Sequence, residues 1–146
     1  MLLVKSTDFY LNTDNVYARL RDEYLKYGGL IIACDFDDTL YDFHKKGRSY
    51  NDVIELLRRW RPYAEILITS CVNRTDTERI RFIHRYLREN EIPYDKVNQH
   101  SAKSPTPEAN KLYYNVLLDD RAGLRESYEV LLRLITEIEN GGLSDV

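Results

Sequence analysis

The most constraining feature of this sequence is a short apolar run, Leu-Ile-Ile-Ala-Cys-Asp-Phe, at residues 30–36. Gly28 and Gly29 come directly before it, and acidic residues follow it. A run this short and this rich in Ile is typical of a strand that is buried on both faces, and such strands belong to parallel sheets covered by other layers. The chain therefore has to fold around a central sheet.

Three further segments have the composition of strands, and helical patterns separate them. The strands are predicted at residues 64–69, 94–98 and 113–118. Strands that alternate with helices indicate βαβ units, which produce a parallel sheet with right-handed crossovers.

The helices are predicted from apolar residues spaced three and four apart. One helix covers residues 14–27, and the last helix carries Leu124, Leu131 and Ile135 on one face and stops at Gly141. Ser49 is expected to cap a helix that ends before Pro62. Thr75 and Glu78 have the form of a capping box and are expected to open another.

Length and composition indicate one α/β domain over residues 1–146, since 43% of the residues are hydrophobic and 31% are charged. We expect a three-layer parallel sheet of about four to five strands, with helices on both faces. We expect residues 1–28 to form an N-terminal extension with a helix, and residues 41–50 to form a small hairpin or a short flap.

Charge and hydropathy exclude several classes of protein. The net charge of −3 gives no global basic field of the kind that generic nucleic-acid binding uses. No apolar run reaches the length of a membrane span, and residues 1–10 lack the pattern of a signal peptide. Cys34 and Cys71 do not form a disulfide framework, so we expect a cytoplasmic protein with free thiols and no membrane partner.

Polar residues follow the predicted strands where ligands bind in open parallel sheets. Asp35 and Asp37 end the first strand and project on the same side, since side chains alternate along a strand. Two carboxylates placed together repel, and a hard cation such as Mg²⁺ relieves the repulsion. Taken alone, however, these acids could equally form a solvated loop that caps a helix.

The other strand ends carry weaker signals. Thr69 and Ser70 follow the second strand, and their hydroxyls could hold a phosphate oxygen, although such residues are common at helix starts. Asp119 and Asp120 follow the fourth strand, where acids near a core need a partner. Lys103 precedes that strand in a turn-rich segment, and by itself it reads as an exposed loop lysine.

Together, the order Asp-x-Asp-x-Thr, then Thr or Ser, then Lys, then Asp-Asp resembles the four motifs of the haloacid dehalogenase-like superfamily. The match spans residues 31–121. The resemblance implies a Rossmann-like fold. It also implies a phosphohydrolase, because phosphohydrolases of this superfamily use an aspartate as general acid at the position of Asp37, whereas halide-displacing members need no general acid there.

The resemblance also implies roles for individual residues. Asp35 would be the nucleophile that forms an aspartyl-phosphate, and Asp37 the general acid and base. Thr69 and Lys103 would hold the phosphoryl oxygens. The expected cofactor is Mg²⁺, and its expected ligands are Asp35, the main-chain carbonyl of Asp37, Asp119 and Asp120. Further expected substrate contacts come from Thr39, Ser70 and Arg121.

Some assignments stay open within this resemblance. Ser70 is a rival to Thr69 as the second-motif hydroxyl, and Lys111 is a rival to Lys103. The interval between Lys103 and Asp119 leaves little room for a full helix.

The intervals between the motifs are too short for a cap domain, which implies an open site and a bulky phosphate as substrate. The expected substrate is a phosphorylated small molecule, such as a nucleotide, or a polynucleotide end. Lys45 and Lys46 in the flap could attract a polynucleotide, or they could be ordinary solubilising residues.

Two other functions compete with hydrolysis. A phospho-receiver domain uses similar residue types, but it places its acidic pair first and its lysine last, whereas Lys103 here precedes the second acidic pair. A phosphotransferase, or a non-hydrolytic phosphate-binding module on the same fold, would carry the same motifs.

Overall fold

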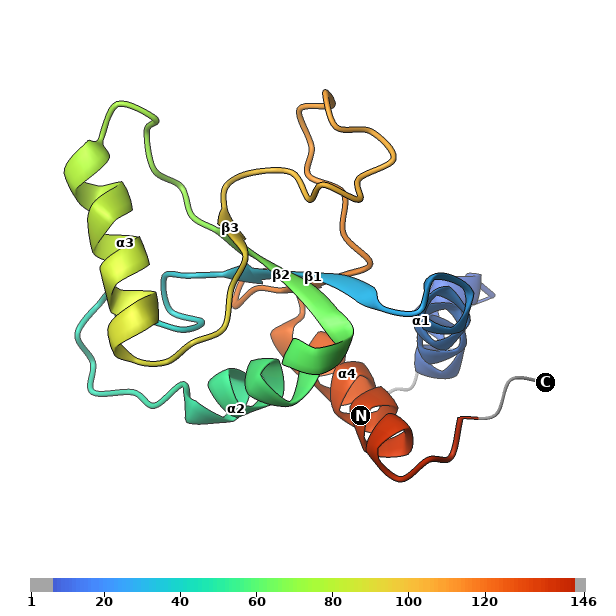
Figure 1. Cartoon of the computed structure of the whole chain (residues 1–146). Helices are drawn as coiled ribbons and strands as arrows, with labels where there is room; N and C mark the ends of the chain where they lie inside the picture. Colours follow the sequence, from blue (N-terminus) through green and yellow to red (C-terminus); the bar gives the residue numbers. More distant parts are fainter. Residues whose placement is uncertain (1–6, 144–146) are drawn as a thin grey trace.

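The computed structural model describes residues 7–143 and contains one parallel sheet of four strands in the order β3-β2-β1-β4. The strands are β1 (Leu30–Asp35), β2 (Ala64–Thr69), β3 (Lys96–Val97) and β4 (Val116–Leu118). Helices lie around this sheet (Figure 1). The fold is therefore α/β and Rossmann-like, as the sequence predicts, with its three layers built around the central sheet.

The two outer strands are shorter than the sequence predicts. The backbone N–H groups of Asp95 and Asn98 donate to carbonyls of β2, and that of Asn115 donates to the Ile31 carbonyl, but these residues do not extend the ladder. Only Lys96–Val97 and Val116–Leu118 pair as strands. The prediction of strands over 94–98 and 113–118 was right in place and too long.

Four α-helices accompany the sheet: α1 (Thr13–Tyr27), α2 (Asn51–Trp60), α3 (Thr77–Glu89) and α4 (Leu124–Glu139). Short 3₁₀ turns precede α1 and follow α2. No helix in the described part of the chain is long and apolar enough to span a membrane. The predicted N-terminal extension is seen from residue 7 onward, since residues 1–6 lie outside the described part.

Local signals at the helix ends hold with two corrections. Tyr50, and not Ser49, is the N-cap residue of α2, and no side chain caps that helix; the Ser49 hydroxyl only accepts from the Asn51 N–H at 3.3 Å. Gly28 has a φ of 71° and ends α1, as its position predicts. The carboxylate of Asp76, not the hydroxyl of Thr75, caps α3 by accepting from the Arg79 N–H at 3.1 Å. The sequence predicted Thr75 as the N-cap residue in a capping box with Glu78, and this was wrong by one residue. The Thr75 carbonyl accepts from the Thr77 N–H in a turn that precedes the helix.

The main core lies against the face of the sheet that carries Ile32 and Cys34, both fully buried. The indole N–H of Trp60 in α2 donates to the carbonyl of Leu131 in α4 at 3.1 Å. Figure 1 shows α2 and α4 together below the sheet. Burial raises the pKa of the Cys34 thiol well above its usual value, so Cys34 packs as an apolar residue, as expected.

The segment 98–115 passes over the opposite side of the sheet (Figure 1). Glu65 of β2 faces this side, since side chains alternate along a strand and its neighbour Ile66 belongs to the main core. The hydroxyl of Ser101 donates to a Glu65 carboxylate oxygen at 2.5 Å, and Ser101 is 2% exposed. This segment contains no helix, as the short interval before β4 predicts.

The flap at residues 41–50 is a loop and not a hairpin. The carboxylate of Asp42 accepts from the backbone N–H groups of Lys46 at 3.1 Å and Gly47 at 2.8 Å. Tyr41 forms one isolated bridge with Asp37. Side-chain hydrogen bonds to the backbone thus replace a strand ladder here.

Candidate functional site

Three carboxylates converge where β1 and β4 end. The two strands are parallel neighbours, with Cys34 opposite Leu118, so the residues that follow these positions lie side by side. One carboxylate oxygen from each of Asp35, Asp119 and Asp120 lies within 4.8 Å of the others. The donors are all oxygen, and this donor set fits a hard cation such as Mg²⁺ better than a soft metal.

Asp35 is the most perturbed acid of this cluster. Burial, the charge of Asp119 and a hydrogen bond with Asp120 raise the pKa of Asp35 from 3.8 to about 7. A hydrogen bond from Thr39 acts in the opposite direction. A cation beside Asp35 would therefore favour its ionised form at neutral pH.

Thr39 ties the two acidic segments together. It is 0% exposed, and its hydroxyl lies 3.3 Å from a carboxylate oxygen of Asp35 and 3.3 Å from one of Asp120. The same hydroxyl accepts from the Asp120 backbone N–H at 3.1 Å. Its contacts are internal, and its role in substrate binding stays a prediction.

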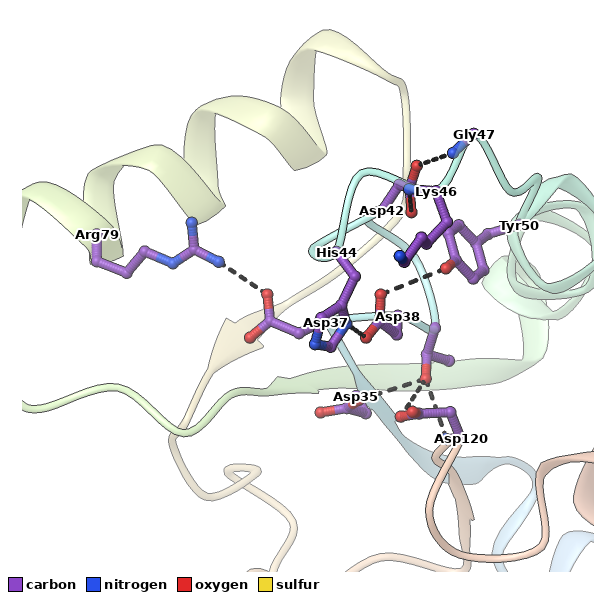
Figure 2. Close-up of polar contacts among 11 residues, drawn as sticks. Asp35, Asp37, Asp38, Asp42, His44, Lys46, Gly47, Tyr50, Arg79 and Asp120 are labelled. Atoms are coloured by element: carbon purple, nitrogen blue, oxygen red, sulfur yellow. Dashed lines mark hydrogen bonds and ion pairs between the residues drawn. The ribbon is translucent and has the colours of Figure 1, made fainter.

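Asp37 forms an ion pair with Arg79, a residue that the sequence did not single out. Figure 2 shows Arg79 of α3 reaching toward Asp37, and the two side chains are 2.7 Å apart. The Ser70 hydroxyl donates to the second carboxylate oxygen of Asp37 at 3.3 Å. The predicted acid/base residue is thus held by one cation and one hydroxyl.

Aromatic rings surround the guanidinium of Arg79. Its central carbon lies 4.9 Å from the ring centre of Phe82 and 5.6 to 6.0 Å from those of Tyr41, Phe43 and Phe36. Rings at this range attract a cation and limit the positions that its side chain can take. In the sequence Arg79 is one of several arginines on a helix, so only tertiary structure identifies it.

Asp38 belongs to a separate contact with the flap. Its carboxylate contacts the His44 ring at 2.5 Å and the Tyr50 hydroxyl at 3.4 Å (Figure 2). Partial burial raises the pKa of Asp38, but the hydrogen bonds and charge of His44 outweigh it, and the net pKa lies below 3.8. Asp38 has a φ of 59°, which turns the backbone sharply after Asp37.

The two candidate hydroxyls occupy neighbouring positions. Thr69 is opposite Asp35 in the register of β1 and β2, and its carbonyl accepts from the Phe36 N–H at 2.9 Å. Ser70 comes next and contacts Asp37 as described above. Asn98, which the sequence did not single out, holds Ser70 through two bonds of 2.8 Å to its backbone.

The structure does not bring Lys103 to the acidic cluster. The turn that contains it is anchored by Ser101 to Glu65, and Glu65 is opposite Ile31 near the beginning of β1. Ile31 and Asp35 are four residues apart in β1, which at about 3.3 Å per residue places the anchor of this turn about 13 Å from Asp35 along the strand. Its rival Lys111 lies over the ring of Tyr114 at 5.8 Å.

Arg121 lies beside the cluster through its backbone. Its N–H donates to the carboxylate of Asp119 at 2.9 Å, and the residue itself is exposed. The flap residues Lys45 and Lys46 are also exposed. Substrate contacts by these side chains stay predictions.

Comparisons with known proteins leave the family of this chain open. No protein-family model matches the chain, and neither a search of curated proteins nor a search of solved structures finds a match. Function therefore has to be argued from the side chains of the site.

Proposed function

We propose that this chain is a Mg²⁺-dependent phosphomonoester hydrolase of the haloacid dehalogenase-like type, with Asp35 as its nucleophile. The observation that supports this most is the convergence of the Asp35, Asp119 and Asp120 carboxylates at the ends of two parallel strands. Acids that are distant in sequence and share a few ångströms of space need a charge partner. Phosphoryl transfer uses such a partner to neutralise charge.

The proposed reaction has two steps. A carboxylate oxygen of Asp35 bonds to phosphorus, the bond from phosphorus to the ester oxygen breaks, and Asp37 gives its proton to the leaving oxygen. Asp37 then takes a proton from water, the water oxygen bonds to phosphorus, and the bond to Asp35 breaks. Inorganic phosphate leaves, and both carboxyl groups return to their first state.

The residues that would hold Mg²⁺ are Asp35, Asp119 and Asp120, with the main-chain carbonyl of Asp37 implied by the resemblance. The cation would neutralise charge on the carboxylates and on the phosphoryl oxygens. Thr69 and Ser70 lie at the adjacent end of β2, from which their hydroxyl or backbone groups would position the phosphoryl group.

A positively charged side chain would also neutralise charge on the phosphoryl oxygens. Lys103 would serve only if the turn anchored to Glu65 moves, whereas Arg79 already contacts Asp37. If Lys103 has this role, Lys103→Ala lowers kcat at least tenfold. A tenfold loss in Lys111→Ala instead would transfer the role to Lys111.

The decisive experiment measures phosphate release from nucleotides, sugar phosphates and phosphorylated oligonucleotides, with Mg²⁺ or with EDTA. We expect turnover by the wild type in Mg²⁺ only, and a loss of at least 1,000-fold in Asp35→Asn. Asp22→Asn is a matched control, because Asp22 is an exposed acid on α1. Turnover that survives in Asp35→Asn would contradict the proposal.

Two alternatives have their own outcomes in the same assay. A phosphotransferase would give mainly the phosphorylated alcohol when an alcohol acceptor is added. A binding module would bind Mg²⁺ and phosphate with no turnover of any compound. The proposed substrate is a phosphorylated small molecule or a polynucleotide end, and the two free thiols support a reducing compartment such as the cytoplasm.

A further inference from the structure

A cavity of about 640 Å³ opens at the end of the sheet opposite the acidic cluster. Its lining includes Gly29 and Leu30 at the start of β1, Ala64 at the start of β2, and Asn115 directly before β4. Since the strands are parallel, all these residues mark their amino ends. The volume lies within the range of small-molecule sites, which is about 300 to 1,000 Å³.

Three tyrosines contribute to the lining of this cavity: Tyr27, Tyr63 and Tyr113. They come from the end of α1, from the 3₁₀ turn before β2 and from the segment before β4. Tyr27 is 66% exposed, and the Lys26 ammonium group lies 5.2 Å from its ring centre, so a ligand would stack on the other face of the ring. Tyrosine rings offer flat faces on which a planar aromatic group can stack.

Two polar side chains of the cavity, Asn115 and Glu65, have hydrogen-bonding capacity that is not used within the described part of the protein. Asn115 is 7% exposed, and its amide oxygen accepts from the Ile31 N–H at 2.7 Å, which orients the amide. Within residues 7–143 its amide nitrogen has no hydrogen-bond partner. Glu65 uses one carboxylate oxygen for Ser101, which leaves the other as an acceptor. Asn115 and Glu65 lie on the two sides of β1 and line the same cavity, and an amide donor and a carboxylate acceptor can recognise the edge of a base.

The lining also carries two cations, Lys103 and Arg61, and two acids, Glu65 and Asp95. Lys103 lines the cavity, and within residues 7–143 its ammonium group has neither a hydrogen-bond nor an ion-pair partner. Arg61 also lines it and is paired with Asp95 at 2.6 Å. The unpaired Lys103 ammonium can therefore take an anionic group of a ligand.

We infer that this cavity is a second ligand site, which binds a nucleoside monophosphate. The base would stack on the tyrosine rings and pair with the Asn115 amide and the Glu65 carboxylate, and the phosphate would bind Lys103. The site is separate from the acidic cluster, because the six residues of β1 lie between them, about 16 Å along the strand. We infer binding and no reaction at this site.

The test titrates the full chain with AMP in EDTA by calorimetry, and maps the bound AMP by backbone amide NMR shifts. We expect the Gly29 and Asn115 amides to shift. We also expect Tyr27→Ala to weaken AMP binding about tenfold. Tyr10→Ala is the matched control with no expected change, since Tyr10 is 55% exposed and does not line this cavity.

Each other outcome overturns the inference. If AMP does not bind, or if it shifts only residues 35–39 and 119–120, the cavity is not its site, and the proposed hydrolase function is unaffected. If ribose 5-phosphate binds as tightly as AMP, the tyrosines recognise no base. If Tyr27→Ala does not fold, the NMR map of the wild-type chain still decides.

Discussion

The two ends of the sheet differ in the kind of backbone segment that positions their side chains. At the carboxyl end, Asp35 and Asp119 follow paired strands directly, so the ladder itself brings them together. At the amino end, Lys103 and Tyr113 come from an irregular segment that is held by scattered hydrogen bonds, such as the one between Ser101 and Glu65, and not by a strand ladder. Residues fixed to strand ends can be placed from sequence, whereas residues on a long loop cannot.

The same difference separates the cations of the two ends. Arg79 is on a helix, and Asp37 and several aromatic rings hold its guanidinium. Lys103 is on a turn and has no such support. We therefore expect changes at the carboxyl end to have larger and more specific effects on turnover.

The largest effect is expected at the metal ligands. Asp119→Asn should lower kcat/KM at least 100-fold and raise the Mg²⁺ concentration needed for half-maximal rate, since a neutral amide is a weaker ligand than a carboxylate. Steady-state kinetics across a Mg²⁺ titration measures both. An unchanged Mg²⁺ requirement would show that Asp119 is not a ligand, and Asp22→Asn controls for the loss of one charge.

The second prediction concerns Arg79. Arg79→Ala should lower kcat about tenfold, because Asp37 loses the partner that fixes its carboxylate, and Arg79→Lys should restore part of the rate by keeping the charge. Arg81→Ala is the control, since Arg81 is an exposed arginine on the same helix. Equal rates in Arg79→Ala and Arg81→Ala would assign the pair a purely structural role.

A third prediction uses the raised pKa of Asp35. Because its folded-state pKa is about 7 against an ordinary value of 3.8, the folded state binds this proton more strongly than the unfolded state. Its contribution to stability is complete below pH 3.8 and is lost as the pH rises to 7. In EDTA, Asp35→Asn should therefore be more stable than the wild type above pH 7, by about 1 to 2 kcal/mol after solvent screening.

Urea unfolding at pH 4 and pH 8 measures this difference. The advantage of Asp35→Asn should be near zero at pH 4 and largest at pH 8. Added Mg²⁺ should stabilise the wild type more than the variant. If the unfolding free energies of Asp35→Asn and the wild type differ by the same amount at pH 4 and pH 8, the pKa of Asp35 is not raised in the folded state.

The smallest effect is expected in the flap. Replacing Lys45 and Lys46 with Ala should lower kcat/KM about threefold for a 5′- or 3′-phosphorylated oligonucleotide, through lost phosphate contacts, and leave p-nitrophenyl phosphate unchanged. The effect should fade at high salt. Equal losses for both substrates, or none, would remove the polynucleotide end from the proposed substrates.

The limits of sequence reasoning are visible in particular residues. Periodicity predicted the helices and the two central strands well, because burial on one face leaves a regular pattern. It made β3 and β4 too long, since flanking residues such as Asp95 bond to a neighbouring strand without extending the ladder. It left a hairpin and a flap as alternatives at residues 41–50, where the Asp42 side chain organises a loop without a strand ladder.

By itself, the sequence determined the parallel sheet and the acids at the ends of β1 and β4, because both follow from local pattern and from strand register. Only the tertiary structure decided that Arg79 contacts Asp37, that Asn98 holds Ser70, and that Lys103 lines a cavity at the opposite end of the sheet. Such contacts join segments that are distant in sequence. They depend on how helices and loops pack against the sheet, which no local pattern encodes.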